Sequence, residues 1–144
     1  MSFFLIVGFF SLTNRVVCGD VTFFETTIKC TTNSAAVPVD LRHCCVANDA
    51  HISEDTVVFV TAKAFSPGHI VPELFLLDTV DMHICSDDIR SPRNCDDVRS
   101  AQPPNVFANG TVVDVLDSRE DRIATFLIVV SEFVRNSQKQ SLIV

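Results

Sequence analysis

Residues 73–85 read ELFLLDTVDMHIC, and from position 80 to position 84 apolar and polar side chains alternate strictly. Successive side chains of a strand point to opposite faces, so this alternation is typical of a β-strand with one buried face and one solvated face. Residues 56–65 (TVVFVTAKAF) begin apolar on both faces and then become half polar. Residues 66–68 (SPG) are typical of a turn. We therefore expect two consecutive strands in this part of the chain.

Further strands are expected on both sides of this pair. Residues 20–29 (DVTFFETTIK) and residues 111–116 (TVVDVL) are rich in β-branched and aromatic side chains, which favours strands. Residues 31–40 are small and polar and include Pro38, which indicates a loop or an edge segment. Residues 43–54 form a polar, irregular stretch. Short strands between turn signals predict a mostly β fold, a small antiparallel β-sandwich stapled by disulfides, with an immunoglobulin-like form as one version of it.

The segment 118–134 fits two secondary structures. Ser118 and Asp121 match a helix capping box, and the apolar residues that follow have helical spacing. The run 128–130 (IVV) is β-branched or apolar on every side, which favours a strand. We prefer the strand for this segment, with the helix as the alternative. Residues 136–144 are expected to fray as a flexible tail.

The N-terminus begins with an uninterrupted apolar run, SFFLIVGFF, over residues 2–10. Its length matches the apolar region of a signal peptide and is too short for a membrane span. Small residues at Cys18 and Gly19 suit cleavage there, although the run lacks a preceding Lys or Arg and Arg15 lies close to the cleavage site. A buried N-terminal strand is the alternative. The expected organisation is a signal peptide over 1–19, a single secreted disulfide-bridged domain over 20–135 and a tail over 136–144, with no membrane span in the mature chain.

Six cysteines in 144 residues indicate an oxidising, extracellular compartment. Cleavage at Cys18 or Gly19 would leave five disulfide candidates: Cys30, Cys44, Cys45, Cys85 and Cys95. Cys44 and Cys45 are adjacent, and the geometry of a disulfide disfavours a bond between neighbours. Cys85 and Cys95 flank a polar loop and would close it locally. Cys30 would then pair with one member of the doublet, which leaves Cys44 or Cys45 either free or paired between chains in a covalent homodimer. Earlier cleavage would keep Cys18 and allow three bridges.

One modification site follows from the same compartment. Asn109-Gly110-Thr111 is an acceptor sequence for N-glycosylation. In a secreted protein this segment should lie on the surface, so we expect Asn109 to be exposed.

Two groups of residues resemble metal sites without the spacing that metals require. His43, Cys44, Cys45 and His51 lack the ligand separation of zinc sites, so we expect disulfides there. The acidic pairs at 87–88 and 96–97 are interpreted as a solvated loop because no calcium-binding spacing is present. The sequence predicts no metal and no cofactor.

Charge and motifs narrow the function. The net charge is −7 and the basic residues are scattered singly, so the positive surface that nucleic acids require is missing from the sequence. No nucleophile motif or phosphate-binding glycine loop is present, so we expect no catalytic residues and no enzyme. We expect a secreted binding or effector protein that contacts an extracellular protein partner; a parasite or viral source would point to immune modulation. The alternative is an extracellular carrier of an apolar ligand, suggested by twelve Phe without Trp or Tyr.

Overall fold

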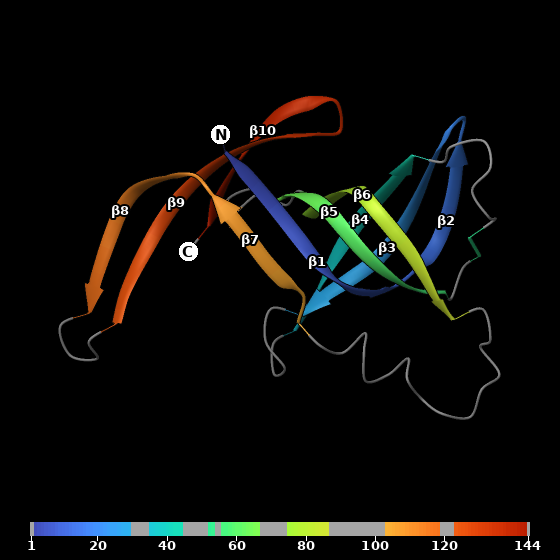
Figure 1. Ribbon diagram of the computed structural model, residues 1–144, viewed down its shortest axis with the longest axis horizontal. Coiled ribbons are helices and arrows are strands. Elements are labelled where there is room, and N and C mark those ends of the chain that lie inside the picture. Colours follow the sequence, from blue (N-terminus) through green and yellow to red (C-terminus); the bar gives the residue numbers. More distant parts are fainter. Residues whose placement is uncertain are drawn as a thin grey trace.

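The computed structural model describes residues 2–29, 35–44, 52–53, 56–66, 75–86, 103–118 and 123–143, and within them it contains ten strands and no helix (Figure 1). The strands are β1 (Phe3–Ser11), β2 (Thr13–Cys18), β3 (Val21–Lys29), β4 (Ala36–Cys44), β5 (Val57–Phe65), β6 (Phe75–Ser86), β7 (Asn105–Asn109), β8 (Thr111–Ser118), β9 (Ile123–Val134) and β10 (Ser137–Ile143). The part of the chain with described coordinates holds no helix that is long and apolar enough to cross a bilayer.

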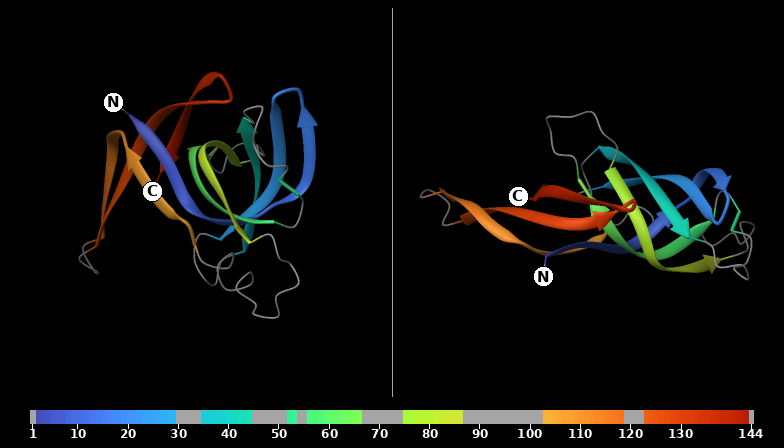
Figure 2. Two further views of the ribbon diagram at one scale, coloured as in Figure 1. Left: turned by 45° about the vertical axis from the view of Figure 1, so that its right-hand side comes forward. Right: turned by 90° about the horizontal axis from the view of Figure 1, so that it is seen from above.

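The larger sheet curls around on itself. Its seven strands follow the order β2-β3-β4-β6-β5-β1-β7, and β10-β9-β8 form a second sheet. Only Leu12 separates β1 from β2, although these strands lie at the sixth and first positions of the larger sheet. Leu12 is fully buried, and its N–H donates to the carbonyl of Thr56 at 3.0 Å. One bent segment therefore supplies β2 at one edge of the larger sheet and β1 beside β7, the strand at the other edge; Figure 2 shows the sheet from two further directions.

One pair of neighbouring strands is parallel. Residues 39–42 of β4 lie alongside residues 75–78 of β6 in the same direction, whereas the other described pairs are antiparallel. With β1 and β2 counted as one bent strand, the spatial order is β1/β2-β3-β4-β6-β5 and back to β1, which resembles the five-stranded Greek-key barrel called the OB-fold. This order differs from the antiparallel sheets of an immunoglobulin-like sandwich.

The hydrophobic core lies inside the curled sheet. Burial alternates along β1, because every second side chain points inward and its neighbour points outward. The inward-facing set continues around the sheet through β5, β6, β4 and β3. Its large and fully buried members are Ile6, Phe10, Leu12, Phe24, Val39, Leu41, Val58, Val60 and Leu77.

The second sheet is fastened to the first at several places, three of which matter for the site. Ser2 donates its hydroxyl to the carbonyl of Asn109 at 3.1 Å and accepts the N–H of Ser131 at 2.9 Å, which joins β1, β7 and β9. Lys63 and Glu132 form an ion pair of 3.4 Å between β5 and β9. The third place is the β9–β10 turn, which is described with the site below. Gly110 links β7 to β8 where the two sheets meet.

The mostly β prediction is confirmed, and the strands form two sheets, which is consistent with the expected β-sandwich. The expected strands at 20–29, 56–65, 73–85 and 111–116 correspond to β3, β5, β6 and β8. The segment 118–134 contains the strand β9, so the preferred interpretation holds and the helix does not form.

Several expectations differ from the structure. The second half of the segment 31–40, which was expected to be a loop or an edge segment, belongs to β4, an interior strand of the larger sheet. Pro38 is tolerated because β4 pairs with β6 only from Val39 onward, so the missing N–H at Pro38 costs no bond to β6. The expected tail at 136–144 is largely β10, which pairs along β9. The alternating residues 80–84 of β6 are not deeply buried on their apolar side. They lie beyond residues 75–78, which pair with β4, and Val80 is 61% exposed.

The N-terminal run lies in the middle of the fold. Residues 3–11 form β1, which pairs with β5 on one side and with β7 on the other. In the folded full chain, this run adopts the alternative that the sequence left open, a buried strand. The signal peptide over 1–19 stays a prediction.

Candidate functional site

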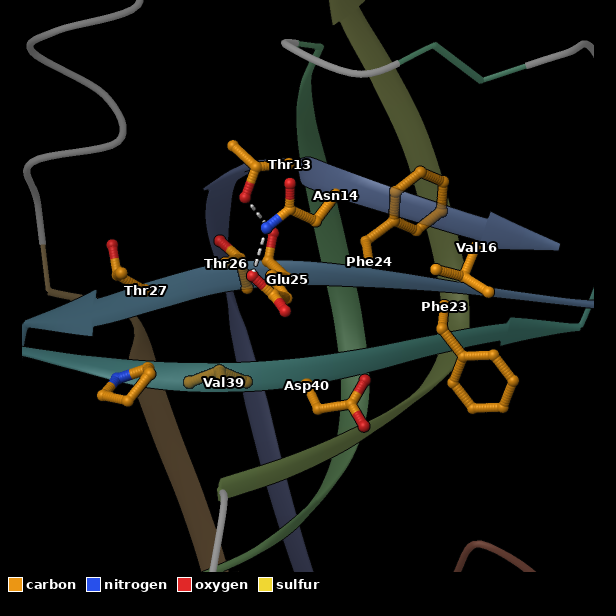
Figure 3. A pocket seen from close by; sticks show the side chains of 11 residues that line it. Thr13, Asn14, Val16, Phe23, Phe24, Glu25, Thr26, Thr27, Val39 and Asp40 are labelled. Atoms are coloured by element: carbon orange, nitrogen blue, oxygen red, sulfur yellow. Dashed lines mark hydrogen bonds between the residues drawn. The ribbon is translucent and has the colours of Figure 1, made fainter.

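A groove of about 510 Å³ lies over strands β2, β3 and β4 (Figure 3). Apolar and polar side chains share its lining. The apolar part includes Val16 and Phe23, and the polar part includes Asn14, Glu25, Thr27 and Asp40. Two of these polar side chains are carboxylates, so the groove is acidic in a protein whose net charge is already −7.

The pairing of β3 with β4 places the two carboxylates together. In the register of this antiparallel pair, Glu25 lies directly opposite Asp40. Directly opposite side chains point to the same face, with Cβ atoms about 5 Å apart, and like charges in this position repel one another. A cation beside the pair would therefore be favoured.

The β2 side of the groove is shaped by an irregularity in its pairing with β3. The register shifts between Thr13 and Val16, and Asn14 adopts the left-handed backbone conformation with φ of 48°. Asn is one of the few residues that tolerate this conformation. The Asn14 amide donates to the Glu25 carboxylate, and the Thr13 hydroxyl donates to the Glu25 carbonyl at 3.0 Å. These bonds hold Glu25 in place without neutralising its charge.

Arg135 neutralises the other carboxylate. Its Nη2 lies 3.2 Å from Oδ2 of Asp40 and donates to the Asp40 carbonyl at 3.0 Å. Its guanidinium carbon lies 5.0 Å from the centre of the Phe23 ring, a cation–π contact at the edge of the groove. Among the described residues, Glu25 has no such cation.

Arg135 is fixed by a second acidic residue. Its backbone N–H donates to Oδ2 of Asp78 at 2.6 Å, and its Nε lies 3.2 Å from Oδ1 of Asp78, at ion-pair distance without the angle of a hydrogen bond. Arg42 holds the same carboxylate in a bidentate pair of 2.8 Å and 2.7 Å. The side chains of Arg42, Asp78 and Arg135 are 11–17% exposed, so water screens these charges only weakly.

The local backbone explains how Arg135 reaches this position. Arg135 and Asn136 form the two-residue turn between β9 and β10, and both have positive φ, 55° and 59°. Two-residue hairpin turns of this kind need positive φ at both central positions, for which Asn is well suited. The tip of the β9–β10 hairpin thereby carries a cation to the surface of β4 and β6.

The cysteines that the structure describes, Cys18, Cys44 and Cys85, are not part of the groove lining. Cys18 and Cys44 are exposed and free, and both pair with Val21 from opposite sides of β3. Two strand spacings, about 9.6 Å, separate them, which exceeds the span of a disulfide. Cys85 is also free. Cys30, Cys45 and Cys95 lie outside the described residues, so the predicted bridges stay predictions.

Asn109 and His43, the other candidates that the structure describes, are not part of the groove lining either. Asn109 is exposed at the end of β7, in line with its expected place on the surface. His43 contacts the hydroxyl of Thr79 at 2.8 Å. His51 and the acidic pairs at 87–88 and 96–97 fall outside the described ranges. Within those ranges, no three His, Cys, Asp or Glu side chains are arranged to hold a metal ion.

The residues that define the groove did not stand out in the sequence. Glu25 was one polar position of an expected strand, and Asp40 ended a segment expected to be a loop. Arg135 lay next to an expected tail, and its partner Asp78 lay inside a strand. The usable signal was Asn136 after an apolar run, because Asn favours a tight turn.

Comparison with known proteins found no matching family model, no matching curated protein and no matching solved structure. What the molecule does is therefore inferred from the groove and from the chemistry of its surface.

Proposed function

We propose that this protein is an extracellular binding protein that acts through protein–protein contacts, and that its groove receives a basic side chain from an extended segment of the partner. The observation that carries the proposal is the pair formed by Glu25 and Asp40, of which only Asp40 is matched by a cation within the described structure. A Lys or Arg side chain would place its charge beside Glu25. Its aliphatic stem would lie against Phe23 and Val16.

The acidity of the groove argues against other ligand classes. The face formed by the second and third strands is where OB-folds bind oligonucleotides and oligosaccharides. The groove lies over the corresponding strands β3 and β4, but the unmatched carboxylate of Glu25 would repel phosphates. An apolar ligand would have to bury this carboxylate, which is costly. The alternative function as an apolar carrier therefore gains no support from the groove, and we propose a binding role rather than an enzymatic one.

The proposed compartment rests on the cysteine content and on the exposed acceptor residue Asn109. Disulfides among Cys30, Cys44, Cys45, Cys85 and Cys95 belong to the same proposal, and the exposed Cys44 suits an intermolecular bond. Removal of residues 1–19 would take away β1 and β2, including the Thr13–Val16 side of the groove. The groove proposal therefore applies to the chain that keeps these strands. Intact-mass measurement of the released protein, reduced and non-reduced, would give its N-terminus, glycan and bridges.

The groove is tested with a labelled peptide of alternating lysine and leucine, measured by fluorescence polarisation with the full chain. We expect Glu25→Gln to weaken binding at least about fivefold, which corresponds to about 1 kcal/mol. Asp114→Asn is the matched control, since it removes an exposed carboxylate on β8 outside the groove. Equal binding of a glutamate–leucine peptide, or equal affinity of the two variants, would contradict the proposal.

A further inference from the structure

The groove lies at one end of a row of charged side chains from β6, β4, β3 and the β9–β10 turn. The charges along the row alternate as far as its last member, and the order is Arg42, Asp78, Arg135, Asp40 and Glu25. Two cations against three anions leave the row with a net charge of −1. Within the described part of the chain no cation pairs with Glu25, so one further positive charge beside this residue would balance the row.

Arg135 lies where a second basic side chain of a partner would have to bind. Its Nη2 already contacts a carboxylate oxygen of Asp40 at 3.2 Å and the Asp40 carbonyl at 3.0 Å. Its guanidinium carbon lies 5.0 Å from the centre of the Phe23 ring, so this ring already has a cation beside it. The Arg135 side chain is 17% exposed and is also held by Asp78. Displacing a largely buried, paired charge is costly, so Arg135 is a fixed part of the groove.

The neighbours of Glu25 along β3 do not favour a second cation either. Side chains two positions apart point to the same face of a strand, so Phe23 and Thr27 flank Glu25, and both line the groove. Phe23 is in contact with Arg135, and Thr27 is uncharged. Lys29 lies two positions beyond Thr27 on the same face and adds a positive charge at that end. A segment that lies along β3 therefore meets one acidic position with a cation beyond it on either side.

We propose that the groove receives a segment with a single basic side chain, and that Arg135 is the specificity-determining residue that excludes a second one. This inference rests on the proposed function of the groove and names the class of segment that it binds: one Lys or Arg with uncharged residues two positions away on both sides. A second basic side chain would meet the Arg135 guanidinium. Like charges brought together in this way select against the wrong partner.

The backbone at position 135 allows this charge to be removed without straining the turn. Arg135 has φ of 55°, a conformation that Asn adopts more readily than most side chains do. In Arg135→Asn, Arg42 would still hold Asp78 through its bidentate pair. Asp40 would lose its cation, so the groove would contain two unmatched carboxylates opposite one another. We expect this variant to favour segments with two basic side chains.

Fluorescence polarisation with the full chain tests the proposal at about 0.15 M salt, where charges more than about 8 Å apart are largely screened. One labelled peptide carries a single lysine with glutamine two positions before and after it. In the two-lysine peptides, lysine replaces one or the other glutamine. We expect the wild type to bind the two-lysine peptides no more than about twofold more tightly than the single-lysine peptide. Arg135→Asn should prefer a two-lysine peptide at least about fivefold, which corresponds to about 1 kcal/mol.

Two control variants keep the wild-type ratio if the proposal is correct. Arg135→Lys retains the charge, and Lys139→Gln removes a cation from β10, outside the groove lining. Circular dichroism checks the folding of each variant, and the wild-type comparison needs no variant. A wild type that prefers a two-lysine peptide fivefold or more would overturn the proposal. So would a folded Arg135→Asn with an unchanged ratio, or a Lys139→Gln whose ratio rises equally.

The two proposals about the groove fail separately. If Glu25→Gln binds the single-lysine peptide as tightly as the wild type does, the groove does not bind a basic side chain and the proposed function fails. If Glu25→Gln weakens binding but the wild type prefers two lysines, the groove binds basic segments and only the role of Arg135 is wrong.

Discussion

β1 and β8 are strands of similar length that both carry large apolar side chains, but their surroundings differ. β1 pairs with β5 and β7, and alternate side chains along it are buried. β8 pairs with β9 alone in its sheet, and Val112, Val113 and Val115 are about half exposed. Apolar composition alone therefore does not determine burial; the number of neighbouring strands and the layer above them do. β1, which has neighbours on both edges, contributes to the core, whereas β8, which has one neighbour, leaves apolar side chains exposed.

The largest expected effect is in β1. Phe10 is 2% exposed, so Phe10→Ala would leave a cavity and should lower the free energy of unfolding by about 3–5 kcal/mol. Val115→Ala in β8 should change it by no more than about 0.5 kcal/mol. Urea unfolding of both variants measures the difference. Equal losses would show that β1 and β8 are buried alike and would contradict the comparison.

The next effect concerns the contact between the hairpin tip and the curled sheet. Asp78→Ala would leave Arg42 and Arg135 without their shared carboxylate, and should cost about 3 kcal/mol because these groups are largely buried. Asp81→Ala is the control, since its ion pair with His83 is mostly exposed and should contribute less than about 1 kcal/mol. Thermal unfolding followed by circular dichroism compares the two. A small effect of Asp78→Ala would mean that the tip is not held there.

A smaller effect is expected where the curled sheet joins the second sheet. A side chain at Gly110 would collide with the carbonyl oxygen of Val129 and approach a methyl of Val130 to 2.9 Å, so Gly110→Ala should cost about 1–3 kcal/mol. Gly19 has φ of 61° and open space around it. Gly19→Asn should be nearly neutral, because Asn tolerates this conformation. Chemical denaturation would compare the free energies of unfolding of the two variants. A larger loss for Gly110→Ala would show that close packing, rather than backbone conformation, requires glycine at position 110.

The strands that could be predicted from the sequence are those whose own residues favour a β-strand. β3, β5, β6 and β8 are rich in β-branched or aromatic residues, and β-branched residues at 128–130 favoured the strand in β9. β4 was missed because Pro38 and small polar residues normally indicate a loop. Its place in the sheet depends on pairing with β3 and β6. Such pairing between separate strands leaves no pattern in the local sequence of β4.

The candidate site was harder to predict than the fold for the same reason. Glu25 and Asp40 come together only through the register of β3 and β4. Arg135 reaches Asp40 from 95 positions away, across two sheets. Contacts between residues so far apart in the chain cannot be predicted from the spacing of neighbouring residues. The N-terminal run was ambiguous in another way, because a signal peptide and a buried strand require the same apolar composition.

Hydrogen–deuterium exchange of the full chain tests the contrast between β1 and β8 most directly, by comparing peptides that cover residues 3–11 and residues 111–118. We expect the amides of 3–11 to be among the slowest to exchange, because this strand opens only when the core opens. Residues 111–118 should exchange much faster. Exchange of residues 3–11 at the rate of residues 111–118, or faster, would contradict the placement of β1 at the centre of the fold.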